Sequence, residues 1–249
     1  MNSSLGAIIL AAGKGKRMQS QTTNKVASLL KNKPMIQHIV EFMERLGVSQ
    51  TVVVVGFAKE SVMEALSGFN VTFSEQTEQL GTGHAVEVAL ASLKPEITDV
   101  IVVYGDDAVL YNRNNTKVIT DLIAEHMAQQ NSITFLTIEQ ENPFALGRIV
   151  RDENENILGI VEEKNASDEQ KKITEINPGC FVFNVEFLKQ FIKKIEKNDI
   201  AGEYYLTDLV DIARTHQQKM NAVRGGKLLW RGVNTPDELA QAEQLISQI

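Results

Sequence analysis

Two glycines and three cations fall within five residues near the start of the chain. This segment, 13–17 (Gly-Lys-Gly-Lys-Arg), follows an apolar run at 7–10 that is typical of a buried strand. Glycines let backbone N–H groups approach an anion closely, and Arg17 can hold a phosphate with two hydrogen bonds. The pattern predicts a phosphate-binding loop at the end of a strand, although a solvated basic turn explains this loop alone about equally well.

Two common phosphate loops are excluded by spacing. A Walker loop requires Ser or Thr after its Gly-Lys pair, and Lys14 is followed by Gly15. The dinucleotide-binding fingerprint requires a third glycine, whose place is taken by Met18. A dehydrogenase of similar build is therefore the less favoured interpretation.

A pair of acidic residues ends a second apolar run. Asp106 and Asp107 follow the run at 100–104 and the single Gly105. Mg²⁺ prefers one or two carboxylates together with phosphate oxygens, so a carboxylate near a basic loop indicates a magnesium site. Gly-Asp is also a common turn pair, and by itself this segment favours the turn.

Strands and helices alternate along the chain up to about residue 139. Strands are expected at 7–10, 51–55, 71–73, 100–104 and 133–138, and helices at 34–46, 61–66, 81–93 and 118–127. This alternation predicts an α/β fold, a Rossmann-like, mostly parallel sheet with helices on both faces. Ligands bind such sheets beyond the carboxyl ends of the strands, where both polar segments would lie.

The pattern changes after residue 139. Strands are expected at 149–150, 157–161 and 181–183 without helices between them, and they predict a small antiparallel insertion beside the main sheet. Helices are expected at about 185–195, 205–214 and 236–249. Because no linker rich in Pro, Gly or Ser interrupts the sequence, a single domain over residues 1–249 is expected.

Composition narrows the class of protein. The 249 residues carry a formal charge of −7, which disfavours broad binding of nucleic acid. Cys180 is the single cysteine, so no internal disulfide is possible. No apolar run approaches the roughly 18 residues of a membrane helix, and the first residues carry no basic segment of a signal peptide. A cytoplasmic protein that does not bind membranes is expected.

Taken together, the motifs resemble those of the sugar-1-phosphate nucleotidyltransferases. Residues 10–18 and Lys25 fit the family's first motif, in which a strand leads into Leu-x-Ala-Gly-x-Gly, Arg-Met and a nearby lysine. Lys16 stands where the family often has Thr or Ser, and Asn24 where it usually has Pro. The segment 75–85 is similar to the Gln…Leu-Gly-Thr-x-His-Ala motif of the N-acetylglucosamine-1-phosphate uridylyltransferases. The resemblance extends to about residue 239 and implies the nucleotide-diphospho-sugar transferase fold.

The resemblance also implies roles for individual residues. The implied catalytic residues are Arg17 and Lys25, and the implied nucleotide-binding residues are Leu10, Ala11, Ala12, Gly13, Lys14, Gln76, Gly81 and Thr82. The implied sugar-binding residues are Tyr104, Gly147, Glu162 and Asn177, with Lys164 as a candidate phosphate partner. The implied ligands of a Mg²⁺ cofactor are Asp106 and Asn234. His84 is assigned to packing.

Later segments carry both further matches and departures. Residues 203–208 match Glu-Tyr-Tyr-x-Thr-Asp, which also reads as a helix cap with aromatic core residues. Asp107-Ala108 replaces the family's common Val-Pro, and Pro178 replaces a usual threonine, removing a hydroxyl and an N–H beside the sugar pocket. By the same resemblance the nucleotide-binding part is about 1–139, the sugar-binding part about 140–234, and 235–249 a C-terminal helix.

The implied activity is synthesis of a UDP-sugar and pyrophosphate from UTP and a sugar 1-phosphate. N-acetylglucosamine 1-phosphate is the favoured acceptor, as in nucleotide-sugar biosynthesis for the cell envelope. The alternatives are another sugar 1-phosphate, CTP in place of UTP, or a nucleotide-sugar sensor without turnover. Bifunctional relatives add an acetyltransferase domain of hexapeptide repeats. This chain ends after one helix, so no trimer built through such repeats is expected.

Overall fold

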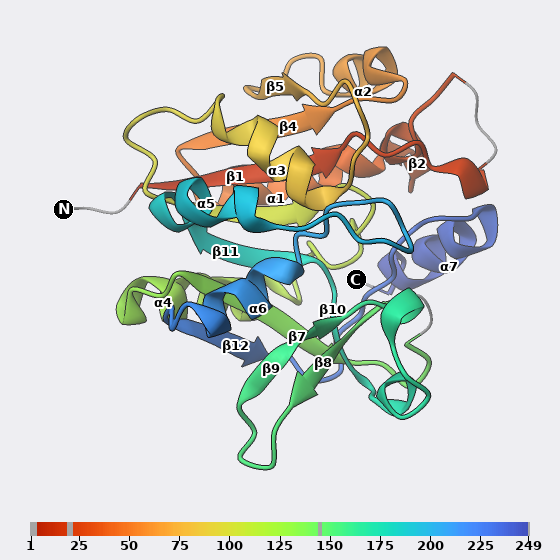
Figure 1. Ribbon diagram of the computed structural model, residues 1–249. Helices are drawn as coiled ribbons and strands as arrows, with labels where there is room; N and C mark the ends of the chain where they lie inside the picture. Colours follow the sequence, from red (N-terminus) through yellow and green to blue (C-terminus); the bar gives the residue numbers. More distant parts are fainter. Residues whose placement is uncertain (1–3, 19–21, 144–145, 249) are drawn as a thin grey trace.

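The computed structural model describes residues 4–18, 22–143 and 146–248, and a sheet runs through the centre of this part of the chain (Figure 1). Within these residues the sheet has ten strands in the order β5-β4-β1-β6-β11-β7-β10-β8-β9, with β12 paired to β7. The strands are β1 Leu5–Ala11, β4 Gln50–Val55, β5 Thr72–Glu75, β6 Asp99–Tyr104, β7 Ile133–Glu139, β8 Gly147–Arg151, β9 Ile157–Val161, β10 Glu175–Asn177, β11 Cys180–Asn184 and β12 Met220–Arg224. The short strands β2 Leu29–Leu30 and β3 Lys33–Pro34 pair separately.

Strand direction decides which loops meet. Strand β1 pairs in parallel with both β4 and β6, so that Ile8 lies opposite Val52 and Val102. Strand β11 is antiparallel to both β6 and β7, so β7 runs in the same direction as β6. The carboxyl ends of β1, β5, β6 and β7 therefore share one edge of the sheet with the amino end of β11.

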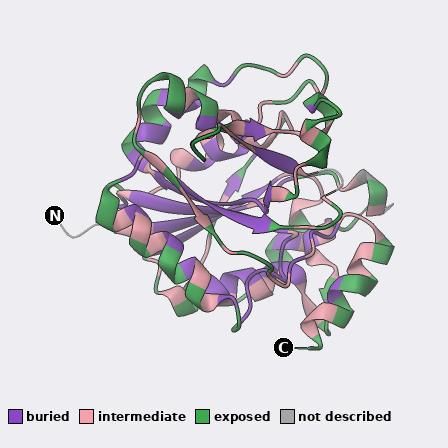
Figure 2. Cartoon of the chain, turned by 90° about the horizontal axis from the view of Figure 1, so that it is seen from below, coloured by how far each residue is buried: buried purple, intermediate pink, exposed green. Residues whose placement is uncertain are grey.

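Helices cover both faces of the sheet, and the expected α/β fold class is confirmed. The helices are α1 Met35–Leu46, α2 Lys59–Ala65, α3 Thr82–Leu90, α4 Thr116–Gln129, α5 Val185–Phe191, α6 Asp208–Thr215 and α7 Pro236–Ile246. Alternate strand residues enter separate apolar cores. Ile9 belongs to the core that contains residues of α1, α2, α4 and α7, whereas Ile8 belongs to the core that contains residues of α3, α5 and α6. In Figure 2 the buried strands lie between helices whose outer surfaces are exposed.

Local sequence explains where the helices begin and end. The apolar positions of α1 recur at helical spacing, and the helix ends at Gly47, whose φ of 74° suits a glycine. Helix α7 has Pro236 in its first turn, and the Thr235 side chain accepts a hydrogen bond from the Glu238 N–H. Both helices lie where the sequence predicts them, at 34–46 and 236–249.

The expected insertion is corrected in one respect. Strand β11, which contains the predicted strand 181–183, lies within the main sheet between β6 and β7. Its side chains are buried on both faces, because Phe181 enters one core and Val182 the other. Strands β8, β9 and β10 then extend the same sheet with antiparallel pairing.

Strands β10 and β12 were not predicted, because neither carries a long apolar run. No helix in the described residues is long and apolar enough to cross a membrane.

A buried polar network ties α4 to the edge of the sheet opposite the predicted site. His126 Nε2 lies 3.2 Å from Asp99 Oδ1, and His126 Nδ1 lies 3.0 Å from Thr134 Oγ1. Thr98 Oγ1 donates to Asp99 Oδ2 at 2.8 Å. Burial alone raises the pKa of Asp99, but the hydrogen bonds from His126 and Thr98 outweigh it and the net pKa is lowered.

Asp99→Asn is expected to lower the free energy of unfolding at pH 7 by about 1–3 kcal/mol, because a charge that accepts hydrogen bonds is lost. Since the folded state lowers the pKa of Asp99, its contribution is fully present above the ordinary value of about 4 and is lost as the pH falls through the lower folded value. Urea unfolding at pH 7 and pH 3 measures both effects. The exposed Asp121→Asn in α4 is the control, expected to change stability by less than about 1 kcal/mol. An Asp99→Asn protein as stable and as acid-sensitive as the parent would contradict this role.

Candidate active site

Two adjoining cavities open at the carboxyl edge of the parallel strands. The larger has a volume of about 730 Å³ and the smaller about 380 Å³. Both are lined by Arg17, Thr82, Tyr104, Asp106, Glu203 and Asn234. The two cavities are therefore neighbouring parts of one site rather than separate sites.

The residues predicted for the site lie around these cavities. The larger cavity is lined by all of those predicted for the nucleotide, Leu10, Ala11, Ala12, Gly13, Lys14, Gln76, Gly81 and Thr82, and by Lys25 and Lys164. The smaller cavity is lined by Gly147, Glu162 and Asn177. The predicted Arg17, Tyr104, Asp106 and Asn234 lie where the two cavities meet.

The loop after β1 is shaped by a side chain that the sequence marked only as a departure. Asn24 is 1 % exposed, and its amide spans the loop and the end of β4. Its Nδ2 donates, and its Oδ1 accepts, in hydrogen bonds with backbone groups: the carbonyls of Ala11 (3.0 Å), Gly13 (3.3 Å) and Phe57 (2.8 Å) and the N–H of Val26 (3.1 Å). Asn24 therefore holds the course of the basic loop, and no pattern in the sequence signals that role.

Two cations of the basic loop face the cavities. Lys14 and Arg17 are exposed and line the cavities. Neither has a hydrogen-bond or ion-pair partner within the described part of the chain, so both face the cavity as unneutralised charges. Such cations suit the outer phosphates of a nucleoside triphosphate.

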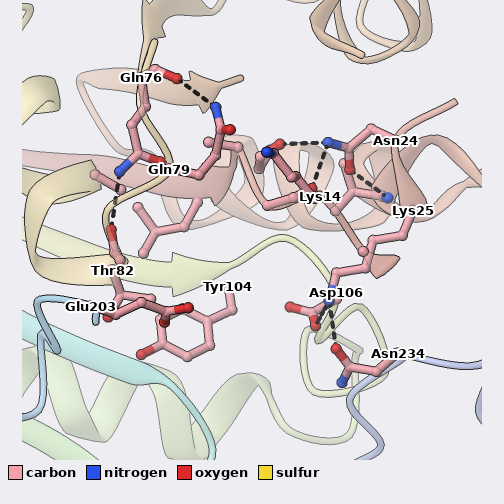
Figure 3. A pocket seen from close by; sticks show the side chains of 18 of the residues that line it. Lys14, Asn24, Lys25, Gln76, Gln79, Thr82, Tyr104, Asp106, Glu203 and Asn234 are labelled. Atoms are coloured by element: carbon pink, nitrogen blue, oxygen red, sulfur yellow. Dashed lines mark hydrogen bonds and ion pairs between the residues drawn. The ribbon is translucent and has the colours of Figure 1, made fainter. Parts of the chain in front are cut away.

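A further cation, Lys25, lines the larger cavity and contacts two residues of the wall that the cavities share. Lys25 Nζ forms an ion pair with Asp106 Oδ2 and donates to Asn234 Oδ1 at 2.7 Å (Figure 3). The side chains of Lys25 and Asp106 are only 13 % and 17 % exposed. The carboxylate and amide oxygens thus already converge on one positive charge, and oxygen donors of this kind fit Mg²⁺. The described residues contain no group of three or more His, Cys, Asp or Glu placed to bind a metal.

Asp107, whose role the sequence left open, lies behind Asp106. It is 3 % exposed and lines the smaller cavity. Burial, followed by the nearby charge of Asp106, raises its pKa, while Lys25 and Trp230 oppose the shift. Its Oδ1 lies 2.9 Å from the point where a Cβ on Gly232 would stand, so Asp107 and the Gly-Val-Asn segment are packed against each other.

The opposite end of the larger cavity is built from the loop before α3. Gly81 has a φ of 114°, and a Cβ there would stand 2.5 Å from the carbonyl oxygen of Tyr204, so the position requires glycine. The Gly83 N–H donates to the same carbonyl at 2.8 Å, and Thr82 Oγ1 accepts from the Leu206 N–H at 3.0 Å. A segment from late in the chain thus closes over this loop.

The assignment of His84 to packing is corrected. Its Nδ1 lies 3.0 Å from Gln76 Nε2, so the ring is hydrogen bonded to a residue predicted to read the base. The spacing of the two residues in the sequence, across a loop and the start of a helix, contains no sign of this contact.

The smaller cavity presents polar groups on a rigid backing. Thr207 Oγ1 donates to Glu162 Oε1 at 2.8 Å, and burial is the main cause that raises the pKa of Glu162. Asn177 donates to the Leu136 carbonyl and accepts from the Gly179 N–H, both at 2.9 Å. These partners fix the carboxylate and the amide before a ligand enters.

Gly147 and Glu203 also line the smaller cavity. A Cβ on Gly147 would stand 2.7 Å from Ile160 Cγ2, so the strand pairing of β8 and β9 leaves no room for a side chain there. Glu203 is exposed and lines both cavities, and Figure 3 places it beside Tyr104. The sequence signal for Glu203 was its close match to the family's Glu-Tyr-Tyr-x-Thr-Asp motif, which also fits a helix cap, and no site role was predicted for it.

Comparison with known families decides the class of protein. The family profile described as nucleotidyl transferase matches residues 6–249. The chain belongs to the nucleotidyl transferase family. The resemblance seen in the motifs is thereby confirmed at the level of the family.

Curated relatives of this nucleotidyl transferase carry the name bifunctional protein GlmU. The chain is 38 % identical over 245 residues to that of Psychrobacter sp. (strain PRwf-1), covering 98 % of this chain and 52 % of the relative. It is 40 % identical over 238 residues to that of Exiguobacterium sibiricum, covering 95 % and 52 %. The chain therefore spans about half the length of the curated relatives it matches.

A solved structure shares the fold of this nucleotidyl transferase. It is a Bacillus anthracis protein assigned as a glucose-1-phosphate thymidylyltransferase and solved in complex with a sucrose. The TM-score is 0.80 at 20 % identity, and the match covers 99 % of this chain and 96 % of the other. At this identity the likeness supports the fold.

Asn24→Ala is expected to lower the free energy of unfolding by about 2–3 kcal/mol and to weaken nucleotide binding, because several buried backbone groups lose their partner. Urea unfolding and titration with a nucleoside triphosphate measure the two effects. Ser61→Ala is the matched control, since it removes the hydrogen bonds of Ser61 Oγ with the Asn24 N–H and the Ala58 carbonyl and leaves the contacts of the Asn24 side chain in place. Equal effects of the two substitutions would show that the Asn24 amide does not shape the loop.

Proposed function

We propose that this nucleotidyl transferase makes a UDP-sugar and pyrophosphate from UTP and a sugar 1-phosphate, with N-acetylglucosamine 1-phosphate as the acceptor. One observation carries the proposal: two cavities of substrate size share a wall that holds the Arg17 cation and the side-chain oxygens of Asp106 and Asn234, which are of the kind that bind Mg²⁺. A transfer between two phosphorylated substrates needs two pockets that meet where the phosphates react.

The larger cavity is proposed to bind UTP. Gln76 and the Gly81-Thr82 pair would hold the uracil ring, because an amide side chain and backbone groups offer both donors and acceptors. Lys14 and Arg17 would hold the β- and γ-phosphates. The choice of UTP rests on the motif at 76–85.

The smaller cavity is proposed to bind the sugar. Glu162, Asn177 and the backbone of Gly147 would contact the sugar hydroxyls, and Tyr104 would border the ring. Lys164 would add positive charge near the phosphate. In this proposal about 1–139 is the nucleotide part, about 140–234 the sugar part and 235–249 a C-terminal helix, and the enzyme serves cytoplasmic nucleotide-sugar synthesis for the cell envelope.

The proposed reaction is an in-line displacement at the α-phosphorus. An oxygen of the acceptor phosphate forms the new P–O bond, and the bond to the bridging oxygen breaks with its electron pair leaving on pyrophosphate. Because a phosphate monoester is already ionised at neutral pH, no general base is required. Catalysis then consists of positioning and charge neutralisation, with Lys25 at the transferring phosphoryl group.

Asp106 and Asn234 are the residues that would hold Mg²⁺, which would neutralise phosphate charge between the two substrates. Their oxygens already face one cation, the Lys25 ammonium. In this proposal the same oxygens would hold Lys25 beside the reacting groups.

The proposal is tested by pyrophosphate release with Mg²⁺, crossing UTP, CTP, GTP and ATP with a panel of sugar 1-phosphates. Turnover confined to UTP and N-acetylglucosamine 1-phosphate is expected. Turnover with another pair would retain the chemistry and refute the specificity. Tight UTP binding without turnover on any acceptor would refute the enzymatic proposal and favour a nucleotide-sugar sensor.

Asp106→Ala is expected to reduce Mg²⁺-dependent turnover by roughly 100-fold or more, since a charge that acts in the transition state is lost. Circular dichroism should show an intact fold. Asp168→Ala, at a side chain that is 99 % exposed, is the control and should retain full activity. Activity of Asp106→Ala close to that of the parent would remove this residue from the proposed metal site.

Lys25→Ala is expected to lower kcat by roughly 100-fold while the Kd for UTP changes much less, because its charge acts on the transferring phosphoryl group. Single-turnover kinetics and equilibrium titration separate the two quantities. Lys25→Arg retains the charge and should recover part of kcat. A loss confined to UTP affinity would instead place Lys25 in ground-state binding.

A further inference from the structure

The amide of Gln76 is held by its surroundings on every side but one. Gln76 follows β5, is 3 % exposed, and its backbone N–H donates to the Val55 carbonyl at 2.8 Å. Its Nε2 lies 3.0 Å from the Gly81 carbonyl oxygen and 3.0 Å from His84 Nδ1. Figure 3 shows the side chain entering the larger cavity from the strand end.

The chemistry of these partners fixes which way the amide faces. A carbonyl oxygen can only accept, so the group beside the Gly81 carbonyl must be the amide nitrogen and not Oε1. The nitrogen has no lone pair to offer, so His84 Nδ1 accepts the second amide hydrogen. The His84 ring is therefore neutral in this contact and carries its proton on Nε2.

Both amide hydrogens of Gln76 are consequently used within the protein. Oε1 receives no hydrogen bond from any residue that the structure describes, while the residue itself lines the cavity. The group left for a ligand is an acceptor. Oε1 of Gln76 can therefore pair with a base whose facing edge carries an N–H donor, and it repels a base whose facing edge carries a lone pair.

We propose that His84 is a positioning residue that locks the Gln76 amide with Oε1 toward the nucleobase, so that the site selects uracil over cytosine. Uracil carries N3–H, a donor, whereas N3 of cytosine carries a lone pair. The inference rests on the proposed function, since it concerns the base that the larger cavity binds. Without His84, the second amide hydrogen loses its acceptor and becomes available as a donor to N3 of cytosine, while the first stays on the Gly81 carbonyl.

The test compares His84→Leu with His84→Asn. Asn Oδ1 and His Nδ1 are both bonded to Cγ, so Asn retains an acceptor at the same position, whereas Leu removes it. The measured quantity is the ratio of kcat/KM with UTP to kcat/KM with CTP, at saturating acceptor. The ratio is expected to fall roughly tenfold in His84→Leu, as for the loss of one buried hydrogen bond, and to stay within about threefold of the parent in His84→Asn.

A purely structural role for His84 would lower kcat/KM for both nucleotides together and leave the ratio unchanged, and that result would overturn the inference. Should His84→Leu not fold, His84→Ala provides the same comparison with a smaller side chain. A parent protein that releases no pyrophosphate with UTP would refute the proposed function instead, before any variant is compared. The two failures are therefore distinguishable.

Discussion

The site depends on one interaction, the contact of the Lys25 ammonium with Asp106 and Asn234. These residues lie 81 and 209 positions away from Lys25 in the chain, at the ends of three separate segments. Because Lys25 and Asp106 are mostly shielded from water, removing either charge leaves the other poorly solvated. The contact thus orients a carboxylate and an amide oxygen toward one point before any substrate is present, and it holds a cation of the larger cavity against the wall that the two cavities share.

The sheet makes that contact possible. Loops that follow parallel strands gather at their carboxyl ends, which brings the basic loop, Gln76 and Asp106 to one edge. Strand β11 runs in the opposite direction, so its amino end lies at the same edge. The segment before β11, which contains Asn177, therefore faces the smaller cavity. A parallel strand in that place would have carried these residues to the far side of the sheet, beside Asp99 and His126.

The segment 204–207 supports the loop at 80–83, which lies much earlier in the chain. Residues 204–206 form hydrogen bonds with the backbone of 80–83 and with Thr82, so the loop proposed to hold the base is supported by a segment from the later half of the chain. Thr207, next in that segment, donates to Glu162 in the smaller cavity. Residues 204–207 therefore support both cavities, and a substitution there would affect the 80–83 loop and Glu162 together.

The sequence alone determined the α/β class, most strands and helices, and the residues gathered at the site, because apolar periodicity and short motifs are local properties. It placed Asp106 at a strand end and Gly47 at a helix end for reasons that neighbouring residues supply. The insertion of β11 between β6 and β7 was decided by tertiary structure, since a run buried on both faces looks the same wherever it pairs. The same holds for Asn24, which bridges backbone groups distant in sequence, and for His84, whose hydrogen bond to Gln76 exists only once β5 and α3 are packed together. Side-chain partners of this kind depend on distances across the fold, which no local pattern records.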